Sequence, residues 1–174
     1  MDNYYKKYIK NLADQGSSSL FFNSSKEHAS CIMANIFRKS NEEICIVAGN
    51  LNGDVSSNPR YQSELLSFLG RGGKLKVLLT NPDLETPSDT ISLLMSSKNS
   101  GQVSIKNTNG SLVKMEIEGN ENEVHWTIGD NKMIRIEHDT KNYLAFGSFN
   151  YKGIDKFINQ FHALEEVSSK LIYN

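Results

Sequence analysis

The chain has 174 residues, which is enough for one domain with a buried core and short for two. Its hydrophobic fraction of 38% and charged fraction of 22% are those of an ordinary globular protein. A net charge of −1 excludes a globally basic surface that would attract nucleic acid or an anionic membrane, so any phosphate binding has to be local.

Neither a signal peptide nor a membrane span is expected, because the first residues hold no apolar segment and no apolar run reaches roughly 20 residues. We therefore expect a cytoplasmic protein in a reducing compartment. Cys31 and Cys45 lie in apolar surroundings and are expected to be buried free thiols rather than a disulfide or a metal pair.

Residues 2–13 place tyrosines and aliphatic side chains at helical spacing, with lysines on the other side. The sequence Gly16-Ser-Ser-Ser19 then interrupts the pattern. We expect residues 1–19 to form an N-terminal helix, either docked on the protein or held as a loose arm. Residues 20–174 are expected to form a single domain.

Helices and apolar strands alternate over the next part of the chain, which is typical of right-handed crossovers and a parallel sheet. Ser24 and Ser25 are good N-caps for the first of these helices. The expected helices are residues 24–38, 61–70 and 88–97, and the expected strands are residues 44–48, 74–80 and 102–106.

From residue 112 onward, apolar and polar residues alternate in short segments joined by Asn, Gly, Asp and Lys turns, which predicts antiparallel or mixed strands. These strands are residues 112–118, 123–128, 132–138 and 143–149, and a closing helix follows over residues 154–172. The expected fold class is α/β. Its mixed sheet is parallel in the N-terminal half, forms antiparallel hairpins in the C-terminal half and carries helices on both faces.

Three segments carry a resemblance to a known family. They are the strand Ile44-Cys-Ile-Val, the segment Leu69-Gly-Arg-Gly-Gly-Lys-Leu-Lys-Val-Leu-Leu, and Gly147-Ser148-Phe149-Asn150 before a final amphipathic helix. In this order the chain resembles the phospholipase D superfamily over about residues 20–173, and the single-domain nucleases are nearest in size. The resemblance implies a phospholipase D-like fold with a phosphate-binding pocket. It also implies a homodimer, because two copies of the single-domain relatives meet with their motifs facing each other.

The active motif of that family reads His-x-Lys, four residues, Asp, six residues, Gly-Ser-x-Asn. Counted back from the retained glycine, its aspartate, lysine and histidine positions fall on Thr140, Arg135 and Met133. In the family the histidine is a nucleophile that forms a phosphohistidine, and Met133 cannot take that role. At the lysine position, Arg135 retains a positive charge, and its planar guanidinium binds phosphate well. Ser148 and Asn150 carry over directly as phosphate-binding positions.

Strand alternation adds a histidine to these positions. A three-residue loop over residues 129–131 places His125 opposite Arg135, on the face that also carries Glu137. We expect these side chains to form one polar cluster with the two retained motif residues, in which His125 acts as a base, a displaced nucleophile or a phosphate donor. Alternatively, Arg135 and Glu137 pair structurally and His125 only fills a polar strand position. Asn50, after the first apolar strand, is expected to support the site, although Asn-rich loops mostly serve turns.

Three functions are compatible with this sequence. The first is a domain that binds a phosphodiester, either nucleic acid or a nucleotide, through a degenerate site with little or no turnover. The second is an active nuclease or phosphodiesterase that uses His125 and no metal. The third is a non-catalytic, homodimeric interaction module. No cofactor is expected, and no Cys/His cluster has the spacing of metal ligands.

Overall fold

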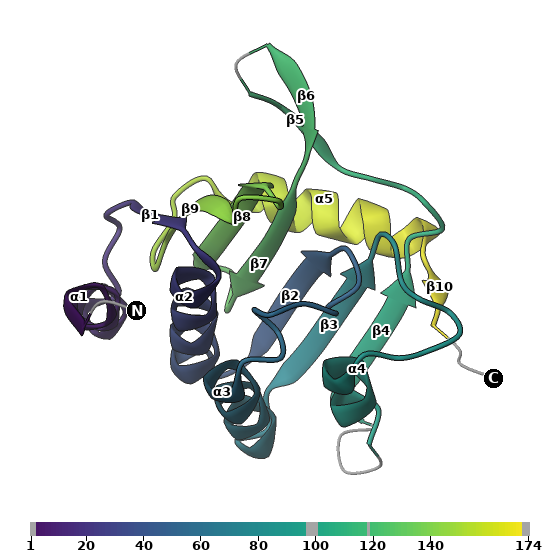
Figure 1. Cartoon of the computed structure of the whole chain (residues 1–174), viewed down its shortest axis with the longest axis horizontal. Coiled ribbons are helices and arrows are strands. Elements are labelled where there is room, and N and C mark those ends of the chain that lie inside the picture. The colour runs from purple at the N-terminus through teal and green to yellow at the C-terminus, as the bar shows by residue number, and fades with distance from the viewer. Residues whose placement is uncertain (1–2, 97–100, 118, 172–174) are drawn as a thin grey trace.

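An eight-stranded sheet forms the centre of the protein (Figure 1). The computed structural model describes residues 3–96, 101–117 and 119–171. Its strands, in their order across the sheet, are β1 (Phe21–Ser24), β9 (Leu144–Ser148), β8 (Met133–Asp139), β7 (His125–Gly129), β2 (Glu43–Ala48), β3 (Lys74–Leu79), β4 (Val103–Asn107) and β10 (Ser169–Lys170). β2, β3 and β4 run parallel to one another, and the remaining neighbours are antiparallel. The predicted mixed sheet is therefore confirmed.

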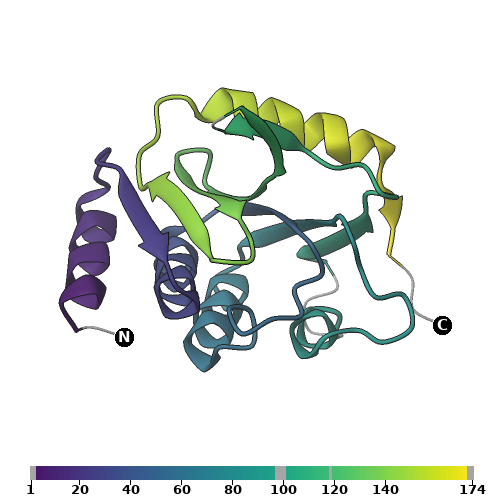
Figure 2. The same cartoon turned by 45° about the horizontal axis from the view of Figure 1, so that its top comes forward.

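Helices cover both faces of this sheet, as predicted (Figure 2). They are α1 (Asn3–Gln15), α2 (Lys26–Lys39), α3 (Pro59–Gly70), α4 (Asp89–Leu94) and α5 (Ile154–Val167). α2, α3 and α4 lie on one face, and α5 covers the other. The side chains of Ser25, Asn58 and Ser88 begin α2, α3 and α4 by accepting hydrogen bonds from backbone N–H groups of the first turn.

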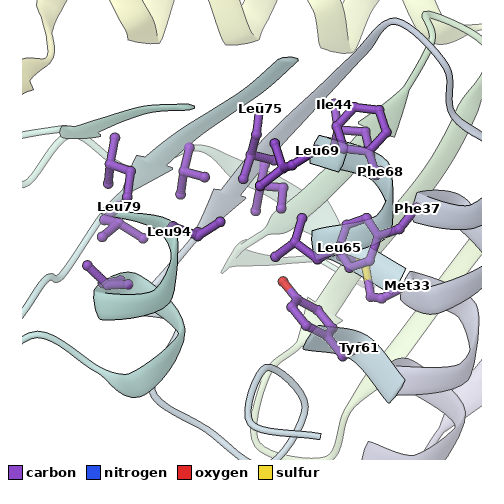
Figure 3. Close-up of a cluster of buried hydrophobic side chains, with 14 of the residues drawn as sticks. Met33, Phe37, Ile44, Tyr61, Leu65, Phe68, Leu69, Leu75, Leu79 and Leu94 are labelled. Carbon is purple, nitrogen blue, oxygen red and sulfur yellow. The ribbon is translucent and has the colours of Figure 1, made fainter. Parts of the chain in front are cut away.

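Two apolar clusters hold the helices to the sheet, one on each face. Under α3 and α4, Leu65, Phe68 and Leu79 belong to a cluster of fully buried side chains (Figure 3). On the opposite face, Trp126 and Phe161 belong to the cluster beneath α5. Burial of such side chains is the main favourable term in folding, so these clusters fix the scaffold on which any site depends.

The N-terminal helix α1 is docked rather than loose. Ile9 and Ala13 are buried in a third cluster that joins α1 to α2. Asp14 pairs with Arg38 of α2 at 2.8 Å. β1, which follows α1 and was not predicted, adds a short edge strand beside β9.

The predicted elements differ from the structure toward the end of the chain. Of the predicted strand at 112–118, residues 114–117 form β5 (Lys114–Ile117). This strand pairs with β6 (Asn120–Glu123) in a separate ribbon that projects from the sheet in Figure 1, and β6 includes the first residue of the predicted strand at 123–128. The closing helix ends at Val167, because the chain then turns to pair β10 with β4. The predicted ends at residues 97 and 172, and residue 118, lie outside the described residues.

The register between β7 and β8 differs from the prediction by two residues. His125 lies opposite Glu137, so the prediction that it lies opposite Arg135 is wrong. The loop has three residues, but it covers 130–132, because the Asp130 carboxylate accepts hydrogen bonds from the backbone N–H groups of Asn41, Glu42 and Glu43, where β2 begins. A shift of two residues keeps each side chain on its predicted face.

Both cysteines are buried free thiols, as predicted. Burial raises the pKa of the Cys45 thiol to about 12, which makes it unreactive at neutral pH. None of the helices in the described part of the chain is both long enough and apolar enough to cross a membrane.

Candidate functional site

A cleft of about 260 Å³ opens at the carboxyl end of β2. The cleft is lined by the loop of residues 49–56, by β7, β8 and the turn after β8, and by residues of β2, α2 and α3. Its lining includes His125, Arg135, Glu137 and Asn50. Four of the predicted site residues therefore come together in one cleft.

Arg135 is fixed in the wall of the cleft, with only 6% of its surface exposed. Its Nη2 donates to Glu137 Oε1 at 2.7 Å, and its Nε donates to Asn23 Oδ1 at 3.2 Å. The amide of Asn23, a buried residue of β1, donates in turn to the carbonyl of Tyr143. A guanidinium carries five N–H donors, and these bonds use two of them.

His125 lies between two carboxylates. Its Nε2 is 3.1 Å from Glu123 Oε1, and its Nδ1 is 3.7 Å from Glu137 Oε2. Burial by itself would lower the pKa of His125, but the hydrogen bonds and charges of Glu137 and Glu123 outweigh it and hold this pKa above its usual value. Burial would likewise raise the pKa of Glu137, yet His125 and Arg135 hold it below its usual value.

The charges that line the cleft come close to balance. Arg135 and a protonated His125 are two cations beside the single carboxylate of Glu137, since Asp54 is paired with Lys26 at 2.6 Å. Glu123 contacts His125 from outside the lining and accepts a hydrogen bond from Thr80 at 2.9 Å. Arg135 and His125 are therefore faced by two carboxylates, Glu137 and Glu123, and the group left to bind an anion is the set of guanidinium N–H donors that Glu137 and Asn23 do not use.

The loop after β2 is held in one shape by its own hydrogen bonds. Ser56 Oγ donates to the carbonyl of Leu51 at 2.7 Å, and Asn50 Oδ1 accepts from the backbone N–H of Asn52 at 2.9 Å. Leu51 has φ of 51°, in the left-handed region that costs a residue with a Cβ about 1–2 kcal/mol. These hydrogen bonds therefore fix the shape of the loop and hold Leu51 in its strained conformation.

A second strained residue also lines the cleft. Tyr143, in the turn between β8 and β9, has φ of 56°. The other non-glycine residues with positive φ in the described part of the chain are Asn109, Asp130 and Asn131, and Asn and Asp tolerate this conformation. Leu51 and Tyr143 both line the cleft. Strained residues persist where the surrounding structure enforces them, and they concentrate at functional sites.

Tyr61 of α3 adds a polar group without a partner. Its hydroxyl is buried and forms no hydrogen bond with any described residue, and Tyr61 lines the cleft. Burial raises the pKa of Tyr61, and the charge of Arg135 opposes this rise without reversing it. The hydroxyl therefore stays protonated and is available as a donor.

The retained Gly-Ser-x-Asn sequence lies outside this cleft. Gly147 is opposite Arg135, so Ser148 is on the other face of the sheet, where it is fully buried and donates to the Ser17 carbonyl at 3.3 Å. Asn150 is exposed beyond the end of β9. The prediction that Ser148 and Asn150 join Arg135 in one cluster is therefore wrong, because consecutive strand residues alternate between faces.

Packing explains two positions of the family motif. Met133, at the histidine position, is buried with Phe21 and Phe149 in the third apolar cluster. A Cβ at Gly147 would lie 2.3 Å from the carbonyl oxygen of Ile134 and 2.7 Å from the Phe21 ring, so this position requires glycine. Neither residue offers a reactive group.

Sequence reasoning missed several residues of the cleft. Glu123 could have been found, because it stands two residues before His125 and a strand would place both on one face. Tyr61 and Leu51 carry no local signal, since an aromatic residue on an amphipathic helix and a leucine in a loop are usually core residues. Tyr143 lines the cleft from the hairpin turn, where it adopts the left-handed conformation.

The described residues contain no group of three or more His, Cys, Asp or Glu side chains that could hold a metal ion. The cleft offers the remaining N–H donors of the Arg135 guanidinium and a histidine that lies between two carboxylates. These groups can bind and orient a polar ligand.

Comparisons with known proteins agree with this geometry at the level of the fold. No protein-family model matches the sequence, and no curated protein matches it. Among solved structures, the archaeal chromatin protein TrmBL2, whose structure shows a novel mode of DNA binding, is 15% identical with a TM-score of 0.58. The match covers 96% of this chain and 60% of TrmBL2, so this chain spans less than two thirds of that protein.

Two further solved structures match over nearly their whole length. NucT from Helicobacter pylori is 14% identical with a TM-score of 0.59, over 87% of this chain and 97% of NucT. Nuc from Salmonella typhimurium, a phospholipase D family member, is 14% identical with a TM-score of 0.55, over 90% of this chain and 99% of Nuc. The chain therefore has the phospholipase D-like fold.

Proposed function

We propose that this chain binds a nucleotide or a strand of nucleic acid through a phosphodiester group held in the cleft, without the covalent chemistry of the phospholipase D family. The buried position of Met133 carries this proposal. A thioether packed among aromatic rings cannot attack phosphorus, so the step that would form a phosphohistidine has no nucleophile at that position.

The hydrogen-bond donors of Arg135 support a phosphodiester as the ligand. Three of the five guanidinium N–H donors are not used by Glu137 and Asn23, and the oxygens of a phosphodiester carry one negative charge and accept such bonds. The guanidinium is already oriented by Glu137 and Asn23, so little conformational entropy is lost when it binds an anion. The DNA-binding mode reported for TrmBL2 is consistent with a nucleic-acid ligand.

The alternative of an active phosphodiesterase that uses His125 makes a separate prediction. Both ring nitrogens of His125 face carboxylates, which suits a proton donor better than a nucleophile. Cleavage that resists a chelator and is abolished by His125→Ala would support this alternative. Self-association as a homodimer and a cytoplasmic location are compatible with either role and stay predictions, and Ser148 and Asn150 take no part in the proposal.

The binding test is fluorescence anisotropy of a labelled oligonucleotide at low and moderate salt. We expect saturable binding whose affinity falls with salt at a slope of about one charge, as for one neutralised phosphate. His125→Gln and Arg135→Gln should weaken it about tenfold or more. The matched control is Lys156→Gln, which removes an exposed cation from α5 on the opposite face.

Circular dichroism of each variant separates loss of binding from loss of fold. The proposal is wrong if the oligonucleotide does not bind at low salt. It is also wrong if Lys156→Gln weakens binding as much as the folded His125→Gln and Arg135→Gln variants do.

A further inference from the structure

The cleft has a second part that a phosphodiester group does not occupy. The wall formed by residues 49–56 contributes backbone groups and the side chains of Asn50 and Leu51, while its one ionisable side chain, Asp54, is paired with Lys26. Apolar side chains of α2 and β2 lie beside this wall. This part suits an uncharged ring with polar edges rather than an anion.

Two residues in an unfavourable backbone conformation line this cleft. Leu51 and Tyr143 are both left-handed, and each is held by a hydrogen bond to its carbonyl, from Ser56 and from Asn23. Glycine or asparagine would meet the backbone requirement at lower cost. Leu51 also packs against the apolar cluster under α3, whereas the turn does not explain the ring of Tyr143. An aliphatic and an aromatic side chain that line one cleft suit the two faces of a flat ring.

The unpartnered hydroxyl of Tyr61 supplies a polar contact for the edge of such a ring. Tyr61 is 1% exposed, and its ring packs at right angles to Phe37 with the centroids 4.8 Å apart. Figure 3 shows the hydroxyl directed from α3 toward the strands. A buried polar group is normally hydrogen-bonded, so this hydroxyl is a group in the cleft lining for which the described residues supply no partner.

We infer that the cleft receives the base of a nucleotide, clamped between Leu51 and Tyr143 and hydrogen-bonded at its edge by Tyr61. This inference rests on the proposed function, in which Arg135 and His125 hold the adjoining phosphodiester. The ligand class is thereby narrowed to a nucleotide or single strand with an unpaired base, because a base stacked in a duplex cannot enter a cleft of this size.

Isothermal titration calorimetry with three probes separates the two parts of the site. The probes are a dinucleoside monophosphate with adenine bases, adenosine, and dimethyl phosphate, which is a phosphodiester without a base. We expect the dinucleoside monophosphate to bind most tightly, adenosine more weakly, and dimethyl phosphate weakest of the three.

Two variants test the residues of the clamp while preserving the fold. Tyr61→Phe removes only the hydroxyl, and Tyr143→Asn removes the ring while keeping a residue that adopts the left-handed conformation. Each should weaken adenosine binding about tenfold. Their unfolding temperatures should stay unchanged or rise, because an unpartnered hydroxyl or a strained tyrosine has been removed. Tyr8→Phe, on α1, is the matched control.

The outcomes distinguish the inference from the proposed function. If dimethyl phosphate binds as tightly as the dinucleoside monophosphate, or if both variants leave affinity within about twofold, the base-binding inference is wrong and phosphodiester binding stands. If adenosine binds as tightly as the dinucleoside monophosphate, the base site stands and the proposed phosphodiester contact is wrong. Absence of binding by all three probes overturns both.

Discussion

The sheet face beneath α2, α3 and α4 has two halves of opposite chemistry. Under α3 and α4, β2 and β3 present an apolar cluster that includes Val77 and Leu79, with no charged member. Across β7 and β8, the same face carries His125, Arg135 and Glu137. Both halves are largely buried, but apolar burial stabilises a fold directly, whereas buried charges lose hydration that their pairing only partly offsets. The charged half is therefore the part of this face that folding alone does not explain.

Phe68→Ala tests the apolar half and should have the largest effect. Phe68 is completely buried, so loss of its ring should lower the free energy of unfolding by about 3–5 kcal/mol, as measured by urea denaturation. Leu66→Ala, on the same helix but 39% exposed, is the control and should cost less than about 1 kcal/mol. Equal losses in the two variants would contradict the assignment of this cluster as the stabilising core.

Arg135→Met tests the charged half. It leaves Glu137 buried without its closest cation, and we expect a loss of about 3 kcal/mol in the free energy of unfolding. The double variant Arg135→Met/Glu137→Leu should recover most of this loss, because no unpaired carboxylate remains. If the double variant is as unstable as the single variant, the Arg135–Glu137 ion pair itself stabilises the fold. That result would contradict the statement that folding alone does not explain the charged half of this face.

Gly147→Ala asks whether the retained motif belongs to the scaffold. The added Cβ would overlap the Ile134 carbonyl and the Phe21 ring, so we expect a loss of about 1–3 kcal/mol in denaturation experiments. Gly70→Ala is the control, because a Cβ at that helical position meets nothing within 4 Å and should stabilise α3 slightly. A Gly147→Ala protein of unchanged stability would show that packing does not require this glycine.

The pH dependence of stability isolates His125 and has the smallest expected effect. Because the folded state raises the pKa of His125, its contribution is fully present below the unfolded value near 6.5 and is lost as pH rises through the folded value. Stability should therefore fall as pH rises above about 6.5, and His125→Gln should remove that pH dependence, which amounts to about 1.4 kcal/mol per unit of pKa shift. An unchanged slope in the variant would mean that the carboxylates do not hold the proton.

The sequence predicted the scaffold better than the site. Periodicity located the helices, the parallel strands and the β7–β8 hairpin, because these patterns arise from local burial. It misplaced the hairpin register by two residues, since the bonds from Asp130 to the turn before β2 join residues far apart in the chain. The prediction that His125, Arg135 and Glu137 share one face of the sheet is nevertheless correct. Side chains alternate between faces with a period of two residues, so a shift of two leaves each side chain on the same face.

The site could be predicted only in part for a related reason. The motif spacing led to Arg135 correctly, but it also suggested Ser148 and Asn150, which strand alternation places elsewhere. Tyr61 and Leu51 reach the cleft through tertiary packing and a left-handed turn, and neither is encoded in local periodicity.

An amide NMR titration of the whole chain with a dinucleoside monophosphate tests the central claim most directly. We predict saturable shifts concentrated in residues 49–56, in β7 and β8, and in the turn that contains Tyr143, with the ligand recovered uncleaved. Shifts concentrated at Ser148 and Asn150, or no saturable shifts in the cleft, would contradict the account.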